Sequence, residues 1–161
     1  MSRSDLYCLR CGTRMAYRER FGKLRPVCPA CDYVHFEDPK VAVAVFICHE
    51  EQVLLVLRAN EPERGKWALP AGYVDRGEDP RVAAEREVLQ ETGLQVQITR
   101  LLDVIYEGLI VIIYEARVIG GELCAADDAA EARWFARDDL PEIAFRSTRQ
   151  VIAAWQNGNS A

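Results

Sequence analysis

The segment 72–94, GYVDRGEDPRVAAEREVLQETGL, constrains the fold of this 161-residue chain more than any other part of the sequence. Asp79 followed by Pro80 predicts the start of a helix, because Asp is a favoured N-cap and Pro is favoured at the first helical position. Gly93 predicts where that helix ends, since glycine readily adopts the left-handed conformation that terminates helices. We therefore expect a helix over residues 80–92, preceded by a loop.

One face of this predicted helix carries side chains that suit a divalent cation. Glu87 and Glu91 are four residues apart, and Gln90 joins the same face. Oxygen ligands of this kind suit Mg²⁺ or Mn²⁺, which bind phosphates and can activate water for attack on phosphorus. Gly72 lies in the preceding loop, where the backbone can approach a ligand closely. The same residues would also make an ordinary charged helix face exposed to solvent.

The spacing of the segment resembles the Nudix box: Gly, five residues, Glu, seven residues, Arg-Glu, an aliphatic, any residue, Glu-Glu, any residue, Gly and an aliphatic. The short stretch 67–71, WALPA, also resembles the approach to the box in that family. By this resemblance, Glu87 and Glu91 are the main Mg²⁺ or Mn²⁺ ligands and are catalytic. The matching positions are Gly72, Glu78, Arg86, Glu87, Val88, Glu91, Gly93 and Leu94.

Gln90 departs from the pattern, because the family usually has a glutamate there. An amide oxygen can still bind a metal, but it carries no charge, so either one metal is bound more weakly or Gln90 only supports the ligands. A lost activity is the other interpretation. The family also commonly needs an acid outside the box to orient or deprotonate water. We expect Glu131 in this catalytic role, with Asp127 and Asp128 as alternatives.

The remaining sequence predicts a mixed α/β domain. Strands are expected over 41–47, 53–57, 96–106, 109–118 and 131–135, with a shorter strand and turn over 67–74 and a hairpin turn at Glu50-Glu51. Ser147 to Gln150 has the form of a capping box before a final helix. Strands and helices do not alternate regularly, which favours a mixed sheet with helices packed on it. The resemblance implies the same α/β fold, a Nudix-type mixed sheet between helices, over residues 37–161.

Residues 1–36 predict a separate small module held by a metal. Cys8-x-x-Cys11 and Cys28-x-x-Cys31 are separated by sixteen residues, which fits a zinc ribbon with four thiolate ligands. Too few apolar residues are present for an independent core, so the Zn²⁺ would be structural. A redox pair or two disulfides are the alternatives.

Charge and hydropathy limit the partners and the location. The net charge of −5 argues against a non-specific nucleic-acid binder, although residues 10–25 are locally basic. The sequence shows neither a membrane-spanning apolar stretch nor a signal peptide, so we expect a cytoplasmic protein with reduced thiols. The family resemblance is compatible with a homodimer.

The combination of a cysteine ribbon and a Nudix box resembles the small zinc-ribbon group that acts on ADP-ribose or FAD. Related zinc-ribbon NADH pyrophosphatases carry a proline-rich array after the box, but residues 99–112 contain no proline. We therefore predict metal-dependent hydrolysis of the diphosphate linkage in a nucleoside diphosphate derivative. One alternative is a house-cleaning pyrophosphohydrolase that acts on nucleoside triphosphates. The other is a regulator that has lost catalysis and senses nucleotides. Expected substrate-binding residues are Arg58 for phosphate, and Trp67, Tyr73 and Phe145 for the base.

Overall fold

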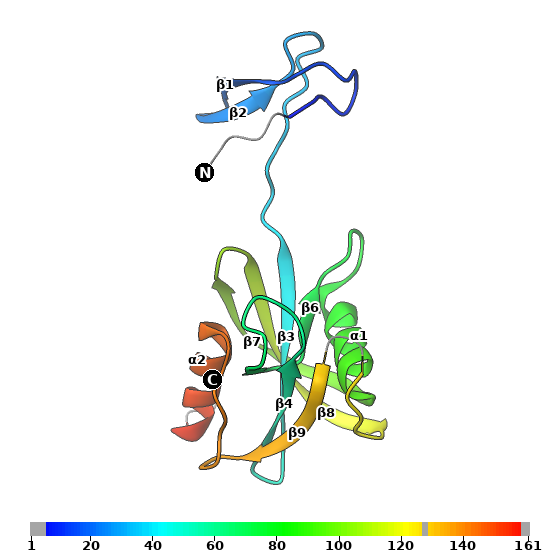
Figure 1. Ribbon diagram of the computed structural model, residues 1–161, viewed down its shortest axis with the longest axis vertical. Coiled ribbons are helices and arrows are strands. Elements are labelled where there is room, and N and C mark those ends of the chain that lie inside the picture. The colour runs from blue at the N-terminus through cyan, green and yellow to red at the C-terminus, as the bar shows by residue number, and fades with distance from the viewer. Residues whose placement is uncertain (1–5, 127–128, 159–161) are drawn as a thin grey trace. The chain divides into compact units, whose positions relative to one another are not determined.

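A computed structural model of the chain describes residues 6–126 and 129–158 (Figure 1). The chain forms two compact units, Met1–Asp38 and Pro39–Ala161. No helix within the described residues is long and apolar enough to cross a membrane.

The first unit contains a β-hairpin that the sequence did not predict. Strand β1 (Ala16–Arg20) pairs antiparallel with β2 (Lys23–Val27). The two residues between them, Phe21 and Gly22, both have positive φ, as the two-residue turns that match strand twist require. Isolated bridges from Tyr7 to Arg14 and from Val27 to Val34 extend this hairpin at the two cysteine turns.

The second unit is built on a mixed sheet of seven strands. The strand order is β5-β4-β3-β8-β7, with β6 also paired to β3 and β9 also paired to β4. The β3–β8 pair is parallel and the other pairs are antiparallel. The strands are β3 (Val41–His49), β4 (Gln52–Arg58), β5 (Trp67–Ala68), β6 (Ala71–Tyr73), β7 (Leu94–Tyr106), β8 (Ile110–Gly121) and β9 (Ala129–Ala136).

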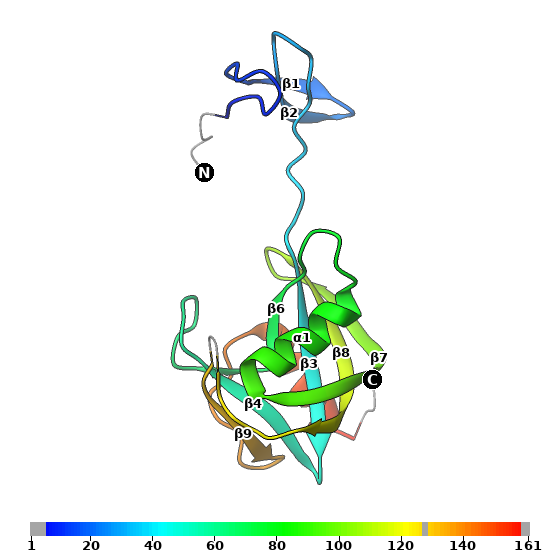
Figure 2. The same cartoon turned by 90° about the vertical axis from the view of Figure 1, so that its right-hand side faces the viewer.

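Two helices, α1 (Pro80–Thr92) and α2 (Arg146–Gln156), cover opposite faces of the sheet (Figures 1 and 2). The alternation of side chains along β3 explains this arrangement. Val43, Val45 and Ile47 belong to the core under α1, together with Ala83, Ala84 and Val88 of the helix. Ala44 and Phe46 belong to the core under α2. The expected α/β architecture, a mixed sheet between helices, is confirmed.

The predicted ends of α1 are also confirmed. The Asp79 side chain accepts a hydrogen bond from the Arg81 backbone N–H at 2.8 Å. Gly93 ends the helix with a φ of 68°, and its N–H donates to the Leu89 carbonyl. The predicted turn at Glu50-Glu51 joins β3 to β4, and both of its residues have positive φ.

The predicted capping box at Ser147 is wrong. Helix α2 begins at Arg146, so its N-cap is Phe145, two residues before Ser147, and Phe145 makes no side-chain capping bond. The Ser147 hydroxyl instead donates to a Glu107 carboxylate oxygen at 2.7 Å, and the Ser147 N–H donates to the other oxygen at 3.1 Å. The Glu107 carboxylate, from the β7–β8 turn, therefore accepts the hydrogen bonds at the start of α2. Hydrogen bonds to a carboxylate are stronger than those to a neutral group.

Candidate active site

A cavity of about 550 Å³ opens beside the acidic face of α1. Small residues of the neighbouring strands, Ala42, Ala44, Ala71 and Gly72, leave room for it. Its other lining residues come mainly from α1, the end of β4 and the loop after it, the end of β6, the β7–β8 turn and the start of α2. They include Arg58, Tyr73, Arg86, Glu87, Gln90, Glu91, Glu107, Phe145, Ser147 and Thr148.

Gly72 is needed because the Glu87 carboxylate lies directly against it. A Cβ added at Gly72 would lie 2.0 Å from the Glu87 Cδ and within 2.3 Å of both carboxylate oxygens. Strand β6 holds Gly72 in place by pairing it with Val43 of β3. Because Gly72 has no side chain, the Glu87 carboxylate can lie directly against the backbone of β6.

Arg86 connects the loop before α1 to the acidic face of the helix. Its Nε and one terminal nitrogen donate to the two oxygens of Glu78, at 2.8 and 2.9 Å. The terminal nitrogen that bonds Glu78 also donates to the Tyr73 carbonyl, at 3.1 Å. The other terminal nitrogen donates to Glu87 at 2.7 Å and to the Gln90 Oε1 at 2.9 Å. Hydrogen bonding to Arg86 lowers the pKa of Glu78 to about 2, and the same bonds raise the pKa of Arg86.

Glu91 and Gln90 complete the acidic face one turn further along α1. Glu91 is buried, with 8% of its surface exposed, and one of its oxygens accepts a hydrogen bond from the Ala71 N–H at 2.9 Å. Gln90 is exposed and lines the same cavity. Three oxygen-bearing side chains thus lie on one face of a rigid helix, with two charges among them. Hard divalent cations prefer oxygen donors of this kind, so the residues present fit Mg²⁺ or Mn²⁺.

Two aromatic rings of the cavity lining lie under cations. The Arg58 guanidinium lies over the Phe145 ring at 4.8 Å, and its Nε donates to the Pro62 carbonyl at 2.9 Å. Tyr73 also lines the cavity, and the Lys40 ammonium lies over its ring at 4.7 Å. Both aromatic rings are thus held by a cation and line the cavity.

The structure does not bring two of the predicted site residues to the cavity. Trp67 packs edge-on against Phe135, with ring centroids 4.6 Å apart, in the core under α2. Glu131 lies inside β9, where its side chain is half exposed and nearest to Arg133 among its ion-pair partners, at 3.9 Å. Asp127 and Asp128, the alternatives to Glu131, lie outside the described residues.

Glu107 is an acid of the cavity that sequence reasoning missed. It lies in the β7–β8 turn with 18% of its side chain exposed, and Arg146 and Ser147 hold its carboxylate. The sequence shows only Glu-Gly in a turn, which carries no signal of a site. Its partners lie about forty positions further along the chain, so only the folded structure reveals them.

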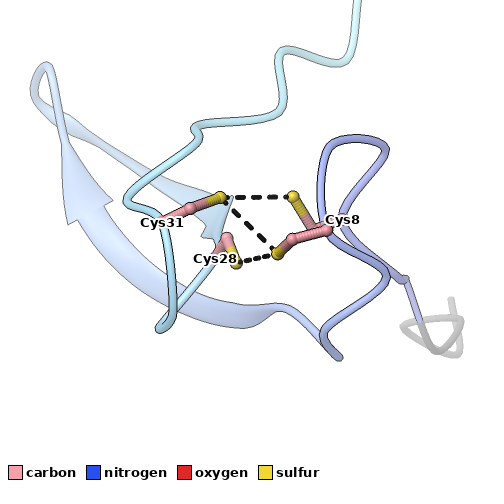
Figure 3. A group of neighbouring side chains, drawn as sticks. Cys8, Cys28 and Cys31 are labelled. Atoms are coloured by element: carbon pink, nitrogen blue, oxygen red, sulfur yellow. Dashed lines mark hydrogen bonds between the residues drawn. The ribbon is translucent and has the colours of Figure 1, made fainter.

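The four cysteines of the first unit meet in one cluster (Figure 3). Their sulfurs all lie within 4.8 Å of one another, and three pairs are 3.5–3.6 Å apart. Four sulfurs at tetrahedral positions around one Zn²⁺ would lie about 3.8 Å apart. The cysteines form no disulfide in this structure, and the grouping of all four sulfurs favours a shared ion over two separate disulfides.

The two cysteine turns have the same backbone design. The N–H of Cys8 donates to the Thr13 carbonyl, and the N–H of Cys28 donates to the carbonyl five residues later, both at 2.8 Å. Gly12 and Asp32, which directly follow the second cysteine of each pair, both have positive φ. Two matching turns that face each other are the arrangement expected of a closed zinc site, and the cluster is compatible with one.

Comparison with known proteins agrees with this geometry. Residues 38–156 match the family model of the NUDIX domain. An ADP-ribose pyrophosphatase of Methanocaldococcus jannaschii is 38% identical over 135 residues, which cover 78% of each chain. The crystal structure of a NUDIX hydrolase from Nitrosomonas europaea superposes with a TM-score of 0.87 at 30% identity, covering 94% of this chain and 90% of that one.

Other relatives are longer proteins. The NAD-capped RNA hydrolase NudC of Stutzerimonas stutzeri is 28% identical over 92% of this chain, but the match covers 53% of that protein. Human 8-oxo-dGDP phosphatase NUDT18 is 36% identical over 63% of this chain and is matched over 33% of its own length. The family match and the archaeal relative agree with the acidic helix and its glycine: the chain belongs to the Nudix family and is a Nudix pyrophosphohydrolase.

Proposed function

We propose that this protein hydrolyses the diphosphate linkage of a nucleoside diphosphate derivative, with ADP-ribose as the preferred substrate and FAD as the next. One observation carries the proposal: the acidic face of α1 and the Arg58–Phe145 stack line the same cavity of about 550 Å³. A diphosphate with a group at each end needs such a site, with a metal-binding region beside an aromatic surface. The archaeal relative named as an ADP-ribose pyrophosphatase supports the choice of substrate.

Glu87 and Glu91 would hold the cation, with the Gln90 amide oxygen as a neutral third donor. When bound, Mg²⁺ or Mn²⁺ neutralises phosphate charge and lowers the pKa of a bound water. Arg86 fixes the direction of Glu87 and Gln90 through its two bonds to them. The Ala71 N–H does the same for Glu91. These contacts keep the ligands in place.

Arg58 would contact a phosphate or stack with the base, because its guanidinium already lies over the Phe145 ring. Tyr73 would offer a second aromatic surface near the acidic face. The proton of the attacking water needs an acceptor inside the cavity. Since Glu131 does not line the cavity, we assign the role of proton acceptor to Glu87, which lines the cavity and lies against Gly72.

The first unit would bind one structural Zn²⁺ through Cys8, Cys11, Cys28 and Cys31. Four thiolates leave no open coordination position for chemistry, so this ion would stabilise the fold of the ribbon.

A turnover panel on the purified chain tests the proposal. ADP-ribose, FAD, NADH, 8-oxo-dGTP and diadenosine polyphosphates are incubated with Mg²⁺ or Mn²⁺, and the products are separated by chromatography. Hydrolysis of ADP-ribose to AMP and ribose 5-phosphate is the expected result, with a loss of about a hundredfold or more in a Glu91→Gln variant. A Glu131→Gln variant serves as the matched control and should keep most of the activity.

Gln90 favours one alternative to this proposal, a nucleotide sensor without turnover. Bound ADP-ribose that is not hydrolysed, together with turnover in a Gln90→Glu variant, would support that alternative. Release of pyrophosphate from a triphosphate at a higher kcat/KM than any diphosphate derivative would instead favour the house-cleaning activity.

A further inference from the structure

One face of the β1–β2 hairpin in the first unit carries two like-charged pairs. The strand register sets Arg18 directly opposite Arg25 and Arg20 directly opposite Lys23. Side chains alternate along a strand, so these four cations share one face, and Glu19, the only acid in residues 16–27, points to the other. We call Arg18, Arg20, Lys23 and Arg25 the cation ladder.

Such a ladder works against the stability of the hairpin. Directly opposite side chains in an antiparallel pair interact closely, and like charges at these positions are destabilising. A two-stranded hairpin is also only marginally stable by itself. The hairpin thus keeps like-charged pairs that lower its stability. A bound polyanion would neutralise these charges and remove the repulsion.

Aromatic rings lie beside the cation ladder. Phe21, in the hairpin turn, stacks with Phe36 at 6.0 Å between ring centroids and 24° between planes, and it is 74% exposed. The Arg25 guanidinium lies over the Phe36 ring at 4.7 Å. Phe36 is itself 47% exposed. A stacked, solvent-accessible aromatic pair next to four cations can bind flat rings and phosphates together.

We propose that this face of the hairpin binds single-stranded nucleic acid. The cation ladder would contact successive backbone phosphates, while Phe21 and Phe36 would stack with unpaired bases. The chain's net charge of −5 does not oppose this, since the acidic residues lie mostly outside the segment: residues 6–36 contain six Arg and Lys against two Asp and Glu. The proposal concerns a surface of the first unit and does not depend on the substrate of the catalytic unit.

Fluorescence anisotropy of labelled single-stranded RNA and DNA of about 12 nucleotides, titrated with the zinc-loaded full chain, tests this proposal. If all four cations contact phosphates, log K should fall with log salt concentration with a slope of about −2.8. Equal binding of RNA and DNA would assign recognition to phosphates and base stacking, and tighter binding of RNA would add contacts to the 2′-hydroxyl. A duplex of the same length should compete poorly, because its bases are not available for stacking.

The decisive variant is Arg18→Glu combined with Arg20→Glu. It converts both like-charged pairs into opposite-charged pairs, so the hairpin should fold at least as well as the original. Affinity should nevertheless fall more than about tenfold, and the salt slope should lose about 1.4 or more. Phe21→Ala should weaken binding at least about fivefold without changing the slope. The control, Arg64→Glu combined with Arg81→Glu, makes the same charge change at exposed positions of the other unit and should bind as the original does.

Several results would overturn the proposal. One is the absence of saturable binding below about 100 µM chain at about 50 mM salt. Another is equal loss of affinity in the control and the ladder variant, which would indicate long-range charge rather than this face. A third is a ladder variant that binds oligonucleotide normally but changes the elution volume on size exclusion, which would assign the face to contact with a second copy of the chain.

Discussion

Gly72→Ala should abolish most activity while leaving the fold intact. The added Cβ would lie 2.0 Å from the Glu87 Cδ, whereas ordinary contacts begin near 3.4 Å, so the carboxylate must move by about 1.4 Å. Displacements near 1 Å at a reacting group can lower rates about a hundredfold, which corresponds to about 2.7 kcal/mol of transition-state stabilisation. Stability should change by less than about 1 kcal/mol, because the clash involves the end of a flexible side chain and the φ of Gly72 is not in the left-handed region.

Gly77→Ala is the matched control, because it has the opposite geometry. Gly77 has a φ of 86°, but no atom lies within 4 Å of an added Cβ. That variant should lose about 1 kcal/mol of stability from backbone strain and keep its kcat/KM when folded. The assays are urea unfolding and ADP-ribose turnover at saturating Mg²⁺. Full activity in Gly72→Ala, or losses of stability and activity in the same proportion in both variants, would refute the steric account of Gly72.

Three further predictions follow from the metal sites and the Arg86 network. Gln90→Glu should lower the Mg²⁺ concentration for half-maximal activity by about tenfold, because it adds a charged donor; an unchanged Mg²⁺ titration would show that position 90 does not reach the ion. Removal of Zn²⁺ by a zinc-selective chelator, with Mg²⁺ kept saturating, should unfold the first unit, seen as lost NMR dispersion for its residues. Turnover by the second unit, which has its own core, should continue. Retained dispersion in the zinc-free chain would contradict a structural ion. Since the folded pKa of Glu78 is about 2 and its ordinary value is 4.5, its bond to Arg86 should stabilise the fold fully above about pH 5 and progressively less as the pH falls from 4.5 towards 2. Urea unfolding across that range should show a weaker pH dependence in Glu78→Gln, and identical curves for both proteins would argue against the bond.

The sequence predicts α1 well because its determinants are local. Asp79 and Gly93 act on backbone groups within four residues, and the spacing of Glu87 and Glu91 follows from helical periodicity alone. The β1–β2 hairpin escaped prediction because its strands are rich in charge instead of β-branched residues. Its turn, Phe21-Gly22, also lacks the Asn-Gly or Asp-Gly pair that marks such hairpins.

Long-range packing determines which aromatic and acidic residues line the cavity, and the sequence alone does not show this. Trp67 and Tyr73 are both aromatic residues in the same short stretch, yet Trp67 packs on Phe135 and Tyr73 lines the cavity. Sequence alone cannot separate these outcomes, because a core and a base-binding surface use the same side chains. Glu107 lines the cavity although the sequence offers no reason to expect it there. Its position depends on a hydrogen bond from Ser147, forty residues later.

Strand β3 shows how the chain builds a core and a cavity from one segment. On the face towards α1 it carries Val43, Val45 and Ile47, which fill the space under the helix. On the other face Ala42 and Ala44 come first, and both line the cavity. The period of two along a strand keeps the residues under α1 and those under α2 on separate faces, and a shift of one residue in register would exchange them. The parallel pairing of β3 with β8 and its antiparallel pairing with β6 fix that register from both sides. The cavity therefore depends on the same pairing that places Gly72 beside Val43 and under the carboxylate of Glu87.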